Sequence, residues 1–340
     1  MRLTHSRAVW LMVLVALLWS IAGVVSRHLE AARSFEVNFW RSAFTVLAIA
    51  AALVALHAAG RAGANGDDAD GATGRPGRRV GAAARLRRGA RAVWRDILRG
   101  GWPLGLSSLC WAVMFTNFMV ALMLTTVATV LITLSIAPLI TALFSRLFLH
   151  HRLPRRTWLA MVVAGAGIAW MFGRQSLDAS ASLGGALVAL AVPFAAATNW
   201  TLLQHLHQRH ARDPAVSEPE MLPAVMVGAL LSALLTLPLA WPFAATARDL
   251  ALLVLLGVVQ LAIPCLLVVR LSRVLPGPEI SLIGLLEVVF GVLLAWVGAG
   301  EVPGPAARAG GTLVIAALLA NEWLALRERR AAGPGLRGAR

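Results

Sequence analysis

The sequence predicts an all-α integral membrane protein with ten transmembrane helices, arranged as two inverted five-helix repeats. Three observations lead to this expectation: a very apolar composition, ten apolar segments of membrane-spanning length, and an internal repeat. Of the 340 residues, 59% are hydrophobic and 14% are charged, and the mean hydropathy is +0.74. A soluble domain could not cover so many apolar side chains with polar surface.

The net charge of +15 arises from arginine, because the sequence contains no lysine. A basic chain can bind nucleic acid, but no soluble domain is available here to carry a groove-reading element. We therefore expect the arginines to face anionic lipid in cytoplasmic loops, and we expect no nucleic-acid partner. Cys110 and Cys265 fall within apolar segments without metal-ligand spacing, so both are interpreted as small core residues.

The ten spans follow from the length of helix that a bilayer requires. A helix that rises about 1.5 Å per residue needs roughly 20 apolar residues to cross about 30 Å of hydrocarbon. The first apolar segment resembles a signal peptide, but it is interpreted as an uncleaved span because further spans follow. A tight turn is expected at Thr125 and Thr126, since one helix over 103–149 would be about 70 Å long. The predicted spans are 8–25, 37–56, 103–122, 127–149, 158–172, 183–203, 221–239, 250–269, 280–297 and 309–326.

Arginine counts give the orientation of these spans. Ten crossings place both termini on one side, and 25 of the 31 arginines fall on that side, which indicates the cytoplasm of a bacterial inner membrane. The expected organisation is first-repeat helices 1–2 over 1–56, a basic and disordered or weakly helical cytoplasmic loop over 57–101, first-repeat helices 3–5 over 102–175, second-repeat helices 6–10 over 183–328, and a cytoplasmic tail over 329–340.

Two polar patches are candidates for a metal site. The acidic sequence GDDADG at 66–71 has no second acidic cluster to complete a site, so a solvated linker is the expected interpretation. His205, His207 and His210 lie among arginines at a predicted helix end, where a hydrated cap is expected instead. No metal and no cofactor is therefore expected.

The two halves of the chain align with each other at an offset of 150 residues. The sequence LSIAPLITALFSRLFLHHRLP at 134–154 lies over GLLEVVFGVLLAWVGAGEVPG at 284–304 without gaps. A looser match places ALLWSIAGVVSRHL at 16–29 over AVPFAAATNWTLLQ at 191–204. Because each repeat has five spans, an odd number, the two repeats are expected to have opposite orientations in the membrane.

The chain resembles the EamA-type transporters of the drug/metabolite transporter superfamily. The resemblance is carried by LLWSIAGVVSR, FWRSAF, LSIAPLITALF and LLEVVFGVLLAWVGAGEVP, in this order, together with Gly310 and Gly311. It implies a ten-span carrier built from two five-span repeats. The chain departs from the family pattern at His151, where an acidic residue is usual, and at Val288, where a proline follows the acid.

Glu287 and Arg41 are the ionisable residues that the sequence places within spans. A charge in hydrocarbon costs about 2.5–3.5 kcal/mol, so such residues are candidates for function. Glu287 is interpreted either as a cavity residue, which binds a cationic group or exchanges a proton, or as a buried acid that fixes helix packing. Arg41 either contributes to the site or extends its side chain to the outer interface. A direct ion pair is not expected, because their predicted depths differ by roughly 13 Å.

A mostly apolar pocket with a few polar groups is the expected binding site. Its predicted residues are Glu287, Trp19, Ser20, Arg41, Trp111, Asn117, Asn199, Trp200 and Gln260. Gly165, Gly167, Gly310 and Gly311 are expected to permit close helix contact, which suits a monomer or a homodimer.

These features predict a secondary transporter, not an enzyme, that moves a small organic metabolite or drug-like solute by alternating access. No nucleotide-binding loop is present, so a gradient would drive transport, with a proton as a candidate coupling ion. Export is the direction that the family resemblance suggests. The alternatives are a polytopic enzyme acting on a lipid-linked substrate and a membrane subunit that does not transport.

Overall fold

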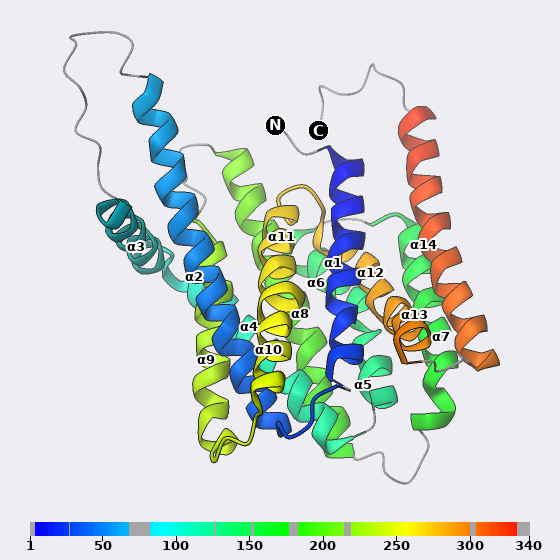
Figure 1. Cartoon of the computed structure of the whole chain (residues 1–340). Helices are drawn as coiled ribbons and strands as arrows, with labels where there is room; N and C mark the ends of the chain where they lie inside the picture. The colour runs from blue at the N-terminus through cyan, green and yellow to red at the C-terminus, as the bar shows by residue number, and fades with distance from the viewer. Residues whose placement is uncertain are drawn as a thin grey trace.

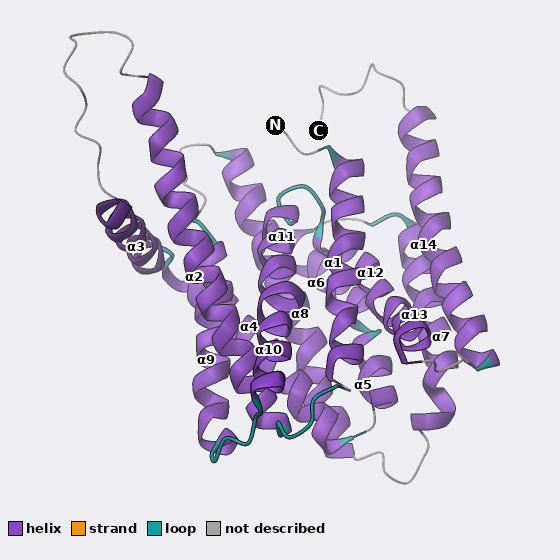
Figure 2. Ribbon diagram, viewed as in Figure 1, coloured by secondary structure: helices purple, strands orange, loops and turns teal. Residues whose placement is uncertain are grey.

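The computed structural model is a bundle of helices, as Figures 1 and 2 show. It describes residues 4–26, 28–67, 82–125, 127–150, 153–176, 183–213, 219–299 and 304–331, and these residues form no strand. The elements are α1 (His5–Ser26), α2 (Ser34–Asp67), α3 (Ala82–Arg99), α4 (Gly101–Leu124), α5 (Val127–Leu134), α6 (Ala137–Leu149), α7 (Arg155–Ser176), α8 (Leu183–Arg212), α9 (Leu222–Ala240), α10 (Ala247–Leu255), the π-helical η1 (Leu256–Ala262), α11 (Ile263–Leu271), α12 (Gly277–Gly284), α13 (Leu286–Ala299) and α14 (Pro305–Ala331).

Eight stretches of helix among the described residues are long and apolar enough to cross a membrane. The ten predicted segments are all largely helical, and two of them, 158–172 in α7 and 309–326 in α14, fall outside those eight. The chain is therefore an all-helical, multi-pass membrane protein, and ten crossings stay a prediction. The start of α1 and the end of α14 lie at the same end of the bundle (Figure 1), as an even number of crossings requires.

Two of the predicted contact glycines hold α7 and α14 together. A Cβ added at Gly167 would lie 2.9 Å from the carbonyl oxygen of Gly310, and one at Gly310 would clash with the backbone of Gly167. At Gly165 and Gly311 an added Cβ would make only ordinary contacts, at 3.8 and 3.9 Å. The close approach that glycine permits is thus made within one chain by Gly167 and Gly310.

The helices are interrupted at three points that matter for the interior. The turn expected between the third and fourth spans is present, because α4 ends at Leu124 and Thr125 adopts an extended conformation. Ser135 and Ile136 separate α5 from α6, and Leu285 separates α12 from α13. Ser135 and Leu285 are related by the 150-residue offset of the internal repeat. The second break forms even though Val288 occupies the position of the family's proline.

Helices from the two predicted repeats are interleaved through polar contacts. Asn38 in α2 donates from Nδ2 to the hydroxyl oxygen of Ser232 in α9, at 3.1 Å. The Thr116 hydroxyl in α4 donates to the same Ser232 oxygen at 2.9 Å. Each of these groups would be costly to bury without a partner, so the contacts fix α9 against α2 and α4.

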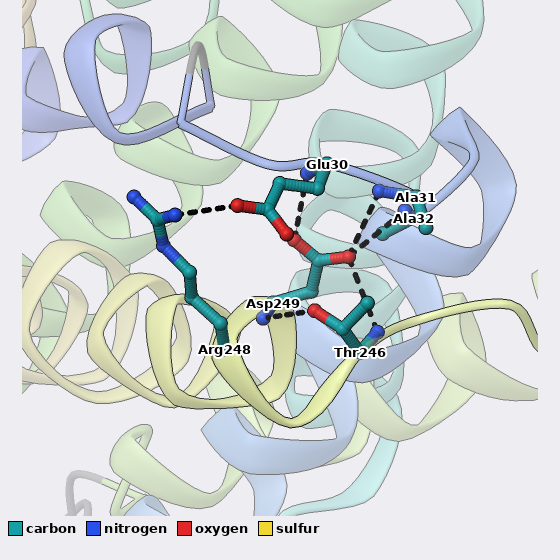
Figure 3. Close-up of polar contacts among 6 residues, drawn as sticks. All are labelled: Glu30, Ala31, Ala32, Thr246, Arg248 and Asp249. Atoms are coloured by element: carbon teal, nitrogen blue, oxygen red, sulfur yellow. Dashed lines mark hydrogen bonds and ion pairs between the residues drawn. The ribbon is translucent and has the colours of Figure 1, made fainter.

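At one end of the bundle, the connection between α1 and α2 is tied to the start of α10 (Figure 3). The buried Asp249 carboxylate accepts hydrogen bonds from the backbone N–H groups of Glu30, Ala31 and Ala32 at 2.8, 3.0 and 3.2 Å. Asp249 also forms a capping box with Thr246 at the N-terminus of α10. We refer to the contacts of Asp249 with residues 30–32 as the Asp249 clasp.

A second carboxylate joins the start of α2 to the connection between α9 and α10. The buried Glu36 side chain, in the first turn of α2, accepts hydrogen bonds from the backbone N–H groups of Ala244 and Ala245. The exposed Arg248 forms an ion pair with Glu30 across the clasp (Figure 3). Carboxylates paired with several backbone donors are well satisfied, which explains how acids are tolerated at this end of an apolar bundle.

The connection over 57–101, for which a disordered or weakly helical loop was expected, is largely helical where the structure describes it. α2 continues to Asp67, and residues 82–99 form the helix α3; residues 68–81 lie outside the described residues. The helix α3 forms because its apolar residues recur at helical spacing: the buried Ala92 and Val93 and the half-buried Ile97 pack toward the bundle, while the arginines from Arg87 to Arg99 are exposed.

Candidate functional site

A cavity of about 190 Å³ lies inside the bundle and is bordered by helices from both predicted repeats. The breaks between α5 and α6 and between α12 and α13 both border it, because Leu134, Ala137, Gly284 and Leu285 are among its lining residues. The π-helical η1 contributes as well. Irregular helix geometry of this kind is concentrated at functional sites. We call this space the central cavity.

Six of the nine predicted site residues line the central cavity. They are Trp19 from α1, Arg41 from α2, Trp111 from α4, Trp200 from α8, Gln260 from η1 and Glu287 from α13. The structure therefore brings together side chains that are up to 268 positions apart in the chain (Glu287 minus Trp19). Whether these residues bind a solute stays a prediction.

The other three predicted residues do not line it. Ser20 follows Trp19 by one position, which rotates its side chain by about 100°, and its hydroxyl donates to the Leu17 carbonyl at 2.6 Å. Asn199 precedes Trp200 and accepts a hydrogen bond from Ser107 at 2.6 Å, so it joins α8 to α4. Asn117 is not among the lining residues.

Arg41 is buried within the bundle and does not extend to the outer interface. Its Nη2 donates to Asn38 Oδ1 at 3.0 Å and to the Phe115 carbonyl at 3.4 Å, while Nε is buried without a partner. α2 can approach η1 at this point because η1 carries Gly257: an added Cβ would lie 2.8 Å from the Arg41 carbonyl oxygen. The alternative in which Arg41 only reaches for the interface is therefore wrong.

Glu287 lies in the first turn of α13, directly after the break at Leu285, and its half-buried side chain borders the central cavity. Among the described residues, no hydrogen bond or ion pair reaches its carboxylate, and Arg41 is not its salt-bridge partner. Helix-to-helix hydrogen bonds, one way in which a buried acid could fix helix packing, are not made by Glu287 among the described residues, and whether Glu287 binds a solute or fixes packing stays a prediction. The cavity thus holds one acid and one base that do not neutralise each other.

Further polar atoms at the cavity also lack partners. Gln260 donates from Nε2 to the Trp19 carbonyl at 3.3 Å, but its Oε1 is buried and unsatisfied, as is the indole N–H of Trp111. Trp111 packs edge-to-face on Trp200, with ring centroids 5.6 Å apart. Buried polar atoms are nearly always paired, so a cluster of unpaired ones at a cavity is what a ligand site presents when empty.

Several lining residues were missed by the sequence prediction because they are apolar. Phe115 and Phe118 lie four and seven positions after Trp111, and Ala196 lies four before Trp200, so helical spacing alone would have found them. Cys265, predicted to be a core residue, is buried but also borders the cavity. The lining is thus aromatic and aliphatic with four polar side chains, those of Arg41, Gln260, Ser281 and Glu287.

The described residues contain no group of three potential metal ligands. His205, His207 and His210 occupy the last turns of α8, and the carboxylates of GDDADG lie almost wholly outside the described residues. The central cavity offers one carboxylate and one thiol, which is too few ligands for a typical metal site.

Comparisons with known proteins place these features in a family. The family model described as "EamA-like transporter family" matches residues 83–173 and 183–321, well over half of the chain and in two segments, one for each repeat. A solved structure titled "Crystal structure of protein" is similar at 19% identity and a TM-score of 0.61, over 94% of this chain and 99% of that one, which shows a shared fold. No curated protein matches the chain in sequence. From the two-segment match and the helical, multi-pass structure, we conclude that the chain belongs to the EamA-like transporter family.

Proposed function

We propose that the protein is a secondary transporter that carries a small organic solute through the central cavity. The observation that supports this most strongly is the set of unpaired groups there: the Glu287 carboxylate, Arg41 Nε, the Trp111 indole N–H and Gln260 Oε1. A small solute would match them if it carried a basic or other donor group for the Glu287 carboxylate and Gln260 Oε1, an acceptor group for Arg41 Nε and the Trp111 indole N–H, and an apolar body. The cavity of about 190 Å³ is smaller than the roughly 300–1,000 Å³ of typical ligand pockets, which favours a small metabolite over a bulky drug.

Alternating access is the proposed mechanism. The paired breaks at Ser135–Ile136 and Leu285 divide two cavity-lining spans into half-helices. Half-helices at the middle of a membrane can bend without loss of a long hydrogen-bonded segment, and they are recurrent in carriers. We propose that bending at these two points opens the cavity to one side of the membrane and then to the other.

We propose a proton gradient as the driving force of transport and export as its direction. Glu287 is the proposed site of proton exchange, because it is the carboxylate at the cavity and has no fixed partner among the described residues. Export from the cytoplasm is proposed from the family resemblance. The arginine distribution supports a bacterial inner-membrane location with both termini in the cytoplasm.

The proposal predicts that a neutral residue at position 287 abolishes transport. Cells that express the wild type, Glu287→Gln or an empty vector are compared by metabolite profiling of cells and medium. Glu220→Gln serves as the matched control, because Glu220 is half-exposed and lies outside the central cavity. We expect the wild type and Glu220→Gln to shift the same solutes, and Glu287→Gln to match the empty vector at equal protein level.

If the wild type itself matches the empty vector over broad metabolite and drug panels, the transport proposal loses its support. A shift that survives in Glu287→Gln would keep transport but remove Glu287 from its mechanism.

A further inference from the structure

We propose that α3 is a membrane-surface helix that binds the phosphate headgroup of anionic phospholipid in the cytoplasmic leaflet. The inference is separate from the solute pathway, since no residue of α3 lines the central cavity. It rests on the orientation given by the arginine distribution, which places the start of α3 and the end of α2 on the cytoplasmic side.

One face of α3 is fixed to α2. Gly89 allows the two backbones to approach closely, because a Cβ there would lie 2.7 Å from the Val54 carbonyl oxygen. Val93 is buried in the main hydrophobic cluster, and Asp96 lies 2.8 Å from Nε2 of His57 in α2. α3 is therefore held in one rotational setting, which decides what its other faces present.

An arginine stripe runs along a second face. Arg88, Arg91 and Arg95 are exposed and follow each other at intervals of three and four residues, so their guanidinium groups lie on one side of the helix. Together with Trp94 they line a surface pocket. Among the described residues none of the three arginines is paired with a carboxylate. A cluster of unpaired guanidinium groups is a site for phosphate oxygens, which arginine binds in a bidentate manner.

An apolar stripe runs beside the arginines. Leu86, Trp94 and Leu98 are 56%, 62% and 65% exposed, and they recur at eight and four residues on one side of the helix. Trp102, at the start of α4, is also exposed, at 68%. Water would not stabilise such a row, whereas the interfacial region of a bilayer takes indole and leucine side chains on one face and arginine on the other.

The placement of α3 agrees with its two stripes. Figure 1 shows α3 nearly end-on beside α2, so it lies crosswise to the spanning helices, as a helix in the plane of the interface does. A free phosphate or a nucleotide would use the arginines but not the adjacent apolar stripe. Anionic phospholipid is the ligand whose chemistry matches both.

The test compares lipid binding by the purified full-length protein in detergent, measured by native mass spectrometry. The probes are phosphatidylglycerol, phosphatidylcholine, and glycerol phosphate as the headgroup without acyl chains. The variant is Arg88→Gln/Arg91→Gln/Arg95→Gln. The matched control is Arg209→Gln/Arg212→Gln/Arg270→Gln, which removes the same charge from three exposed arginines elsewhere on the proposed cytoplasmic side.

We expect the wild type and the control to bind phosphatidylglycerol at least tenfold more tightly than phosphatidylcholine. Each arginine near an anionic surface contributes roughly a fivefold factor, so the triple variant should bind phosphatidylglycerol on the order of a hundredfold more weakly. Size-exclusion chromatography verifies that each variant is folded. If the triple variant does not elute as the wild type does, Arg91→Gln alone should show about a fivefold loss.

Two results would overturn the proposal. One is unchanged phosphatidylglycerol binding in the folded triple variant. The other is displacement of phosphatidylglycerol by glycerol phosphate at equal concentration, which would identify a site for soluble anions instead of lipid. Neither result bears on solute transport, because the central cavity is left intact in every variant.

Discussion

Arg41 and Glu287 place a basic and an acidic side chain on one cavity without forming an ion pair. A charge on either side chain would cost about 2.5–3.5 kcal/mol inside a membrane, and pairing could offset part of that cost. Instead Arg41 is directed toward Asn38 and the Phe115 carbonyl, and Glu287 meets no donor among the described residues. At the residue scale, Arg41 and Glu287 are thus both left without an ionic partner in the described part of the chain, and in the proposed function the solute is the third group that meets them.

The geometry of Arg41 predicts that lysine cannot replace it. The Arg41 guanidinium donates to Asn38 Oδ1 and to the Phe115 carbonyl, and its Nε–H remains as a further donor. A lysine side chain carries all its N–H groups on one nitrogen at the end of a flexible chain, so it cannot reproduce this planar arrangement of donors. We expect Arg41→Lys to reduce transport of the identified solute by at least about tenfold at unchanged protein level.

Arg212→Lys is the control, because Arg212 is exposed at the end of α8 and lies outside the central cavity. Initial transport rates in cells normalised to membrane protein provide the measurement. Equal rates for wild type and Arg41→Lys would show that Arg41 supplies charge alone.

The residue types in the sequence predicted that the cavity lining would contain polar and aromatic side chains. They did not predict every residue that lines it. Glu287, Arg41 and the tryptophans could be selected from the sequence because polar and aromatic groups are conspicuous in apolar spans. Ser20 and Asn199 were selected for the same reason, although each is one position from a true lining residue. Only the rotation of each helix decides between neighbours, and that is set by packing partners far away in the sequence.

Short interruptions and clasped connections, not long loops, shape the helices of this bundle. The breaks at Ser135–Ile136 and Leu285 border the central cavity, and the Asp249 clasp closes one end. At the element scale, the helix breaks therefore border the central cavity, and a hydrogen-bonded connection lies at one end of the bundle. In the proposed mechanism, the half-helices move around the cavity while the clasped end stays fixed.

The Asp249 clasp should contribute strongly to stability. Asp249→Asn keeps the size of the side chain but replaces one acceptor oxygen by a donor, so some of the N–H groups of Glu30, Ala31, Ala32 and Thr246 lose their partner. These hydrogen bonds are only partly buried, so each lost one should cost less than the roughly 1–3 kcal/mol of a fully buried unsatisfied donor, but several are lost together. We expect a clear decrease in the Tm of the detergent-purified protein.

Arg248→Gln is the matched control for the clasp. It removes the neighbouring ion pair with Glu30, whose partners are 62% and 51% exposed, and exposed pairs contribute only about 0–1 kcal/mol. Its Tm should stay close to that of the wild type. Equal Tm losses in the two variants would mean that the clasp contributes no more than a surface ion pair.

The positions of the long helices could be predicted from the sequence, but the breaks within them could be predicted only in part. Apolar length predicted ten segments that are all largely helical, eight of them in helices long and apolar enough to span a membrane, because a helix satisfies backbone groups in hydrocarbon without help from other segments. For α3 the Arg, Ala and Gly content left a disordered or weakly helical loop open, although its buried residues recur with helical spacing. Gly284, which ends α12 directly before Leu285, is the local residue that weakens the helix at this break, but a single glycine did not suffice to predict it.

The whole molecule combines two repeats that are interleaved instead of side by side. α2 and α4 from the first half enclose α9 from the second through Ser232, and the central cavity takes residues from both halves. The offset of 150 residues, found by aligning the sequence with itself, relates the two helix breaks. The sequence thus predicted which segments correspond, but not that segments of opposite halves would pack so closely.

The central claim is that the central cavity is reached from both sides of the membrane during transport. Its most direct test is Ala196→Cys in a Cys110→Ser/Cys265→Ser background, since Ala196 lines the cavity; Ala197→Cys is the control, because Ala197 is fully buried and does not. A membrane-impermeant thiol reagent is applied to intact cells and to inside-out vesicles. We predict that Ala196→Cys reacts in both preparations and Ala197→Cys in neither. Protection of Ala196→Cys in both preparations, or reaction from one side alone, would contradict alternating access through this cavity.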